Sequence, residues 1–155
     1  HKIDDQKKFV IIPQWENSGD TPTKNMFNHV NWKLFDKDIP DDFGFPDFPG
    51  EERTPTLIGP HATQYASALE IDAQHIAAVT ENKGRLFVWG WADYDDVFIG
   101  TTRHRTEFCN EVIITSVADN GIAIRFRLHK KHNGADGECL KTPSQYAYPV
   151  KHDNL

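Results

Sequence analysis

The sequence lacks a basic patch, a long apolar run and a cysteine framework, and each absence excludes a class of protein. Its 17 Lys and Arg residues are outnumbered by 23 Asp and Glu residues, which gives a formal net charge of −6. Nucleic-acid binding needs a concentrated basic surface, so this interspersed and net acidic charge argues against a nucleic acid as partner. The longest compact apolar run, FVII at 9–12, is too short to cross a bilayer.

Catalytic and cofactor-binding motifs are also missing from the sequence. It contains no nucleophile elbow, phosphate-binding loop, dinucleotide fingerprint or zinc-protease motif, and we therefore expect no cofactor. The two cysteines, Cys109 and Cys139, are too few for a disulfide scaffold, and their spacing does not resemble a redox motif or a zinc site. Two alternatives stay open for them, one disulfide in an oxidising compartment or two free thiols.

The sequence is rich in short alternating segments that are separated by turn residues, which is typical of β-strands. The strongest strand signal is 85–98, which is apolar on both faces until Asp93 and therefore predicts a central strand. Segments 104–118 and 122–129 flank an Asn-Gly pair, which predicts a hairpin with positive φ at both turn residues. The further predicted strands are 7–16, 24–35 and 56–71.

One helix and one long loop complete the predicted elements. Asp72 can cap a helix over 72–84 that ends at Gly84. Segment 36–55 is so rich in Pro, Gly and Asp that we expect a loop with at most one short edge strand. The prediction is a single all-β domain over 1–155, an antiparallel immunoglobulin-like β-sandwich with one short helix and irregular ends at about 1–6 and 150–155. A flattened barrel is the alternative.

Several stretches carry a resemblance to a family of uncharacterised bacterial proteins. They are WENSGDTPTKN at 15–25, IGPH at 58–61 and LFVWGWADYDDVF…RHRTEFC at 86–109, and the pattern Y-x-D-V-F…H-x-T-x-F-C is the most specific part. The resemblance implies a domain held at a bacterial membrane by an N-terminal anchor. Because the chain begins at His1, we expect that anchor to precede residue 1, with the domain on either side of the membrane and the periplasm as one option. The resemblance implies no catalytic residues.

Polar side chains gather where the two strongest predicted strands meet. If 85–98 and 104–118 form a hairpin, these side chains lie together at one end of the sheet, on a connection that rigid strands position. Carboxylates and an imidazole could hold a hard cation of unknown identity or act as acid and base. The candidate polar cluster is Asp93, Asp95, Asp96, His104 and Arg105.

We favour a structural interpretation of this polar cluster. In that interpretation the carboxylates accept turn amides or pair with Arg103 or Arg105, and His104 packs against Tyr94. The other local grouping, His129 and His132 followed by Asp136, lies in a Lys-rich hairpin end and is interpreted as a solvated loop.

Aromatic residues provide the second candidate site. Trp89 and Trp91 lie on one face of the predicted central strand, where they either fill the sandwich core or form an exposed binding surface. An exposed pair would also favour pairing with a second copy, as a homodimer.

These observations lead to three hypotheses for function. The first is a non-enzymatic interaction or ligand-binding module of a membrane-anchored bacterial protein, with a protein or small ligand as partner and membrane contact only through the anchor. The second is a metal-binding or hydrolytic domain that uses the Asp/His cluster at the hairpin end. The third is a domain that serves only the assembly of a larger complex.

Overall fold

The computed structural model describes residues 6–50 and 53–145 and confirms an antiparallel all-β fold. The irregular ends expected at about 1–6 and 150–155 lie almost wholly outside the described residues. The main sheet has six strands, and all its pairings are antiparallel. Its order is β10 (Gly134–Ala135), β8 (His104–Ala118), β7 (Arg85–Asp95), β3 (Thr23–Phe35) and β4 (Thr56–Ile58), with β9 (Gly121–Leu128) also paired to β8.

A two-stranded ribbon forms the second layer. In it β1 (Lys8–Ile11) pairs with β6 (Leu69–Asp72), and β2 (Gln14–Glu16) pairs with β5 (Thr63–Tyr65). The single predicted strand at 7–16 is interrupted at Pro13, which has no amide hydrogen for a ladder, although its carbonyl still accepts the Ala66 amide at 2.9 Å. These open, packed sheets are consistent with a β-sandwich, and the immunoglobulin-like topology stays a prediction.

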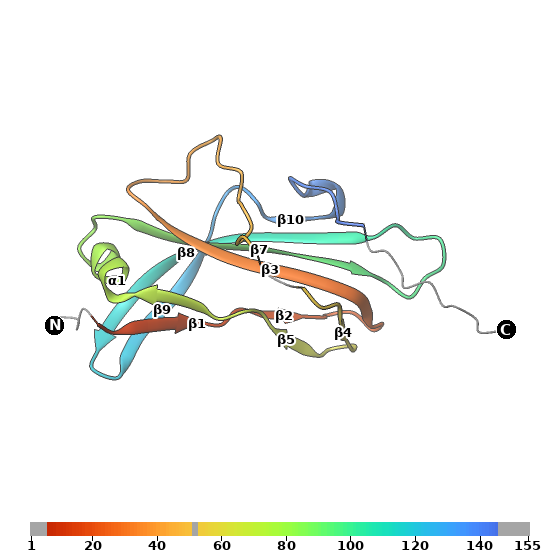
Figure 1. Cartoon of the computed structure of the whole chain (residues 1–155), viewed down its shortest axis with the longest axis horizontal. Coiled ribbons are helices and arrows are strands. Elements are labelled where there is room, and N and C mark those ends of the chain that lie inside the picture. The colour runs from red at the N-terminus through yellow and green to blue at the C-terminus, as the bar shows by residue number, and fades with distance from the viewer. Residues whose placement is uncertain (1–5, 51–52, 146–155) are drawn as a thin grey trace.

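Both faces of the main sheet are covered, which explains why β7 is apolar on both sides. On one face Val30, Leu86 and Val88 pack against the ribbon and α1 (Ala73–Thr80). On the other face Phe87 and Trp89 pack beneath loop 36–50, which supplies Ile39 and the rings of Phe43 and Phe45. Figure 1 shows the ribbon below the sheet and the loop after β3, with the β10 segment, above it.

Three local predictions need correction. The helix ends at Thr80 instead of near Gly84, because Asn82 adopts a positive φ and the Asn82 and Lys83 amides bond back to the Val79 and Ala78 carbonyls. The β8–β9 hairpin is confirmed, but Ala118 pairs with Gly121, so its turn is 119–120 and only Gly121 has positive φ. The single strand predicted at 56–71 is instead three strands, β4, β5 and β6, of which only β4 pairs within the main sheet. The prediction of a loop after β3 is confirmed, since described residues 36–50 and 53–55 contain no strand.

Candidate functional site

The predicted polar cluster is divided between the two faces of the β7–β8 hairpin. Asp93 and Arg105 face each other across the two strands on the loop-covered face, and both are buried. The Arg105 guanidinium binds Asp93 Oδ1 at 3.0 Å and Glu107 Oε1 at 2.8 Å. We call Asp93, Arg105 and Glu107 the buried ion cluster. Glu107 was not among the predicted cluster residues, although its alternation with Arg105 places it on the same face.

The buried ion cluster holds the segment that follows η1 (Asp136–Glu138). Glu107 accepts the Leu140 amide at 2.8 Å and the Lys141 amide at 3.2 Å. Asp93 Oδ2 accepts both the amide and the hydroxyl of Ser144 at 2.9 Å. Burial alone would raise the pKa of Glu107, but its bonds from Arg105 and the Leu140 amide outweigh burial and lower it. Glu107 is therefore an ionised structural anchor, and Asp93 holds the same segment through its bonds to Ser144.

The two candidate binding tryptophans are buried, so of the two alternatives the core position is found and the exposed binding surface is not. Trp89 and Trp91 are 1% and 4% exposed, because loop 36–50 covers this face of the sheet. The Trp89 indole donates to the Pro46 carbonyl at 3.1 Å, and the Trp91 indole donates to Asp47 Oδ1 at 2.7 Å. Both side chains fix the covering loop to the sheet.

His104 and Asp96 lie on the opposite face, at the end of the hairpin. His104 Nε2 lies 2.9 Å from Asp96 Oδ2, and its Nδ1 lies 3.0 Å from Asp136 Oδ2. The bond to Asp96 raises the pKa of the imidazole above its ordinary value, with Asp136 adding to it against the opposing effect of burial. The His104 ring stacks on Tyr94 at 5.3 Å, as predicted.

The structural interpretation of the hairpin connection is confirmed in its details. Asp96 accepts the Phe98 amide at 2.9 Å and the Thr101 hydroxyl, which closes the connection between the strands. Arg103 pairs with Asp95 at 3.2 Å, and Asp95 also accepts the Asn25 amide group at 2.9 Å. The carboxylates of this connection accept turn amides and arginine, as the hypothesis required.

A pocket of about 440 Å³ opens beside His104, between the ribbon and the end of the main sheet. Met26, Ile58 and Ala92 are buried together beneath it, with Trp15 and Tyr94 packed against them. The polar groups at its wall include Asp96, His104 and Thr106, together with the turn at 17–23. We call this site the hairpin-end pocket.

Two features of the sequence build the wall of the hairpin-end pocket. Asn17 organises the turn, because its side-chain amide donates to the Thr21 and Ile58 carbonyls while its oxygen accepts the Gly19 amide. Trp15 on β2 packs edge-on against Phe108, and its buried indole nitrogen has no acceptor among the described residues. Trp15 was not among the predicted site residues, although only Glu16 separates it from the turn residues at 17–22.

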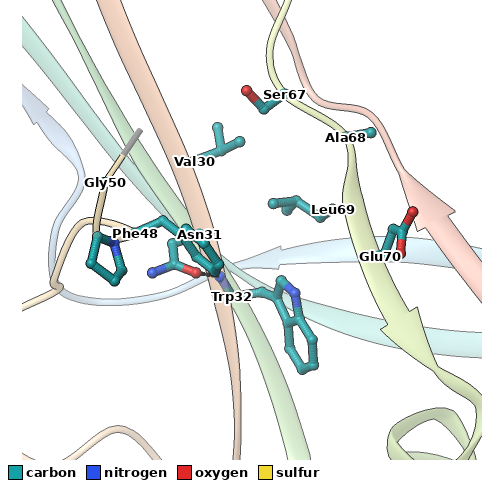
Figure 2. Close-up of a pocket in the computed structure, with 10 residues that line it drawn as sticks. Val30, Asn31, Trp32, Phe48, Gly50, Ser67, Ala68, Leu69 and Glu70 are labelled. Carbon is teal, nitrogen blue, oxygen red and sulfur yellow. Dashed lines mark hydrogen bonds between the residues drawn. The ribbon is translucent and has the colours of Figure 1, made fainter. Parts of the chain in front are cut away.

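A second pocket, of about 470 Å³, lies between β3 and β6. Figure 2 shows Val30 and Leu69 pointing into the space between the two strands, with Trp32 at one end and Phe48 beside Asn31. The edge of β3 is partly closed here, because the Asn31 side chain accepts the Trp32 amide at 2.8 Å. This pocket is mostly apolar and offers few polar groups to orient a ligand.

Of the two alternatives for the cysteines, the structure contains no disulfide between Cys109 and Cys139, and both residues are free thiols. Cys109 is fully buried beneath the covering loop, whereas the Cys139 thiol lies against the Arg105 and Gly134 carbonyls, 3.3 and 3.4 Å away. Burial raises the pKa of Cys109 to about 12 and that of Cys139 to about 11. Neither thiol is therefore activated as a nucleophile.

The histidines interpreted as a solvated loop are instead buried, which corrects that prediction. His129 lies 3.0 Å from Asp38, and His132 stacks on Phe45 with a ring separation of 4.3 Å. Burial lowers the pKa of His132, although its Nδ1 lies 3.2 Å from Glu107 Oε2. Both rings attach the chain after β9 to the covering loop and the sheet.

Neither a metal centre nor a membrane helix is found in the part of the chain that the structure describes. Within 6–50 and 53–145, no group of three or more His, Cys, Asp or Glu is arranged to hold a metal ion. In the same residues no helix has the length and apolarity to cross a membrane. Comparison of the chain with family models, with curated proteins and with solved structures gives no match.

Proposed function

We propose that the chain is a non-enzymatic ligand-binding module of a membrane-anchored bacterial protein, and that the hairpin-end pocket is its binding site. The observation that supports this proposal is a pocket with an apolar floor, two ring side chains and converging polar groups. Its volume of about 440 Å³ lies in the range of small-ligand sites. The membrane anchor rests only on the resemblance of the Y-x-D-V-F…H-x-T-x-F-C pattern.

The chemistry of the pocket wall indicates the class of ligand. Trp15 and Tyr94 offer ring surface to an apolar or flat body. Asp96 and the Thr106 hydroxyl add polar groups at the same wall. We therefore propose a small uncharged or weakly basic ligand that carries a ring and hydrogen-bonding groups.

The metal-binding or hydrolytic hypothesis would need His104 to be released. Both of its ring nitrogens face carboxylates, so the imidazolium has no lone pair for a metal or for accepting a proton. Asp93, which that hypothesis also used, faces the opposite side of the sheet and is bonded to the Arg105 guanidinium. No observation in the described residues favours this second function over ligand binding.

A fragment screen by saturation-transfer NMR tests the proposal with a pocket-filling variant. Thr106→Phe places a ring in the pocket, whereas the control Thr102→Phe places the same ring on the exposed side of the hairpin connection. Ring-containing polar fragments should bind the natural protein and the control but not Thr106→Phe, with circular dichroism confirming that all three fold. Fragments that bind Thr106→Phe equally well, or that bind none of the three proteins, would contradict the proposal.

A further inference from the structure

Strand β9 has a free edge. It pairs with β8 along its whole length and with no other strand of the described chain. The His129 amide donates to the Cys109 carbonyl at 2.9 Å, which fixes residues 109 and 129 as a hydrogen-bonded pair. By alternation, Arg125 and Arg127 direct their backbone groups to β8, while Ile124, Phe126 and Leu128 direct theirs outward. A free edge of this kind can pair with another chain.

An apolar groove of about 690 Å³ lies beside this edge, between β9 and the ribbon. Its lining includes Val10, Ile12, Phe108, Ile124 and Phe126. Phe126 and Leu128 are 52% and 69% exposed, and Val10 and Ile12 are exposed as well. Exposed apolar side chains beside unpaired backbone groups are the two elements that recognise an extended peptide strand.

The opposite face of β9 is positively charged. Arg125 and Arg127 alternate with the apolar residues and point to the other side of the sheet. Arg127 pairs with Glu111, whereas Arg125 has no ion-pair partner among the described residues. In an added antiparallel strand, the residues directly opposite these arginines would be non-hydrogen-bonded neighbours, whose side chains approach most closely.

We propose that the β9 edge binds an extended segment of another protein in which apolar and acidic residues alternate. Its apolar side chains would enter the groove beside Phe126, and its carboxylates would lie opposite Arg125 and Arg127. Two features indicate this partner. The outward backbone groups of β9 can pair with an extended strand, and the two arginines are complementary to acidic side chains. This site is separate from the hairpin-end pocket, and either proposal can fail without the other.

The same charges argue against a second copy as the occupant. Two β9 strands paired antiparallel about Phe126 would place Arg125 of each copy opposite Arg127 of the other. Like charges directly opposite each other destabilise strand pairing. The homodimer expected from an exposed tryptophan pair therefore has no support at this edge.

The test uses two blocked peptides, an alternating Val/Glu strand and an alternating Val/Lys strand of equal length, titrated into ¹⁵N-labelled protein. The acidic peptide should bind about tenfold more tightly than the basic one at low salt and should slow hydrogen exchange at the Ile124, Phe126 and Leu128 amides. Arg125→Glu should reduce or reverse this preference, and Lys130→Glu, which changes an exposed charge outside β9, should leave it intact.

Three results would overturn the proposal. They are equal affinity for the two peptides, protection of amides elsewhere than on β9, and no binding of the acidic peptide at millimolar concentration. Sedimentation of the protein without peptide provides a fourth criterion. A dimer whose β9 amides are already protected would assign this edge to a second copy, whereas a monomer with exposed β9 amides agrees with the proposal.

Discussion

The two faces of the β7–β8 hairpin use similar polar residues for different purposes. On the loop-covered face, Asp93, Arg105 and Glu107 are buried, bonded to one another and bonded to the amides of 140–144. On the ribbon-covered face, Asp96 and His104 remain partly exposed at the wall of a pocket. Residues adjacent in sequence therefore separate into a structural group and a group that can contact a ligand, because side chains alternate across a sheet.

The difference between the faces comes from what covers each one. Loop 36–50 and the chain after β9 cover the first face over the buried ion cluster, and charges under such a cover must be paired and hydrogen-bonded. The ribbon covers the second face but ends at β2 and β5, which leaves a space at the hairpin end. An Asp/His/Arg cluster in a sequence therefore indicates a binding site only when it is known which segments cover each face of the sheet.

The largest effect is expected from breaking the buried ion cluster. Arg105→Met leaves Asp93 and Glu107 as buried charges without their cation, and we expect a loss of about 3–5 kcal/mol in the free energy of unfolding. Arg125→Met, on the same face but without an ion-pair partner in the described chain, should cost less than about 0.5 kcal/mol. Urea unfolding measures both, and similar losses for the two variants would contradict the distinction.

A smaller effect should distinguish the tryptophans of the two faces. Trp91→Phe removes the bond to Asp47 and weakens the ring contact with the Arg53 and Arg105 guanidinium groups, so we expect a loss of about 1–3 kcal/mol. Trp15→Phe removes an indole nitrogen that has no acceptor among the described residues and should change stability by less than about 1 kcal/mol. Thermal unfolding of the two variants tests the order, and a greater loss for Trp15→Phe would refute it.

We expect the contribution of His104 to the stability of the fold to depend on pH. Its pKa is raised in the folded state, so its bonds to Asp96 and Asp136 stabilise the fold fully below the ordinary pKa of about 6.5 and are lost as pH rises through the raised value. His104→Gln should therefore lower the Tm most near pH 5.5 and least near pH 9. A deficit that grows with pH would show that the neutral imidazole is the stabilising form.

No effect is expected from reduction. Because Cys109 and Cys139 are free, dithiothreitol should leave the Tm unchanged, and two thiols should be alkylated when the protein unfolds without a reductant. A disulfide would instead contribute about 2–4 kcal/mol, so a fall in Tm on reduction would reverse this assignment.

Most strands could be predicted from alternation and turn residues, and the reason is physical. Segments 24–35, 85–98 and 104–118 are long enough for the period of two to be unambiguous, and they coincide closely with β3, β7 and β8. The covering role of loop 36–50 was harder to predict. Its proline and glycine content predicts a loop correctly, but whether Ile39 and Phe45 are buried depends on contacts with distant strands.

The candidate site was predicted in part. His104, Asp96 and their turn bonds follow from local sequence, because the hairpin brings them together. Trp15 comes from a strand far away in sequence, and only the packing of the ribbon onto the sheet places it beside Tyr94. The burial of Trp89 and Trp91 likewise depends on the covering loop, so their alternation alone was compatible with either core or surface.

The most direct test of the account is a heteronuclear spectrum of the indole N–H groups during titration with the ring-containing fragments found by the screen. We expect the Trp15 resonance to shift while those of Trp89 and Trp91, whose indoles donate to Pro46 and Asp47, stay in place. Shifts at Trp89 or Trp91 without a shift at Trp15 would contradict this expectation, because the ligand would then enter the face that we describe as closed.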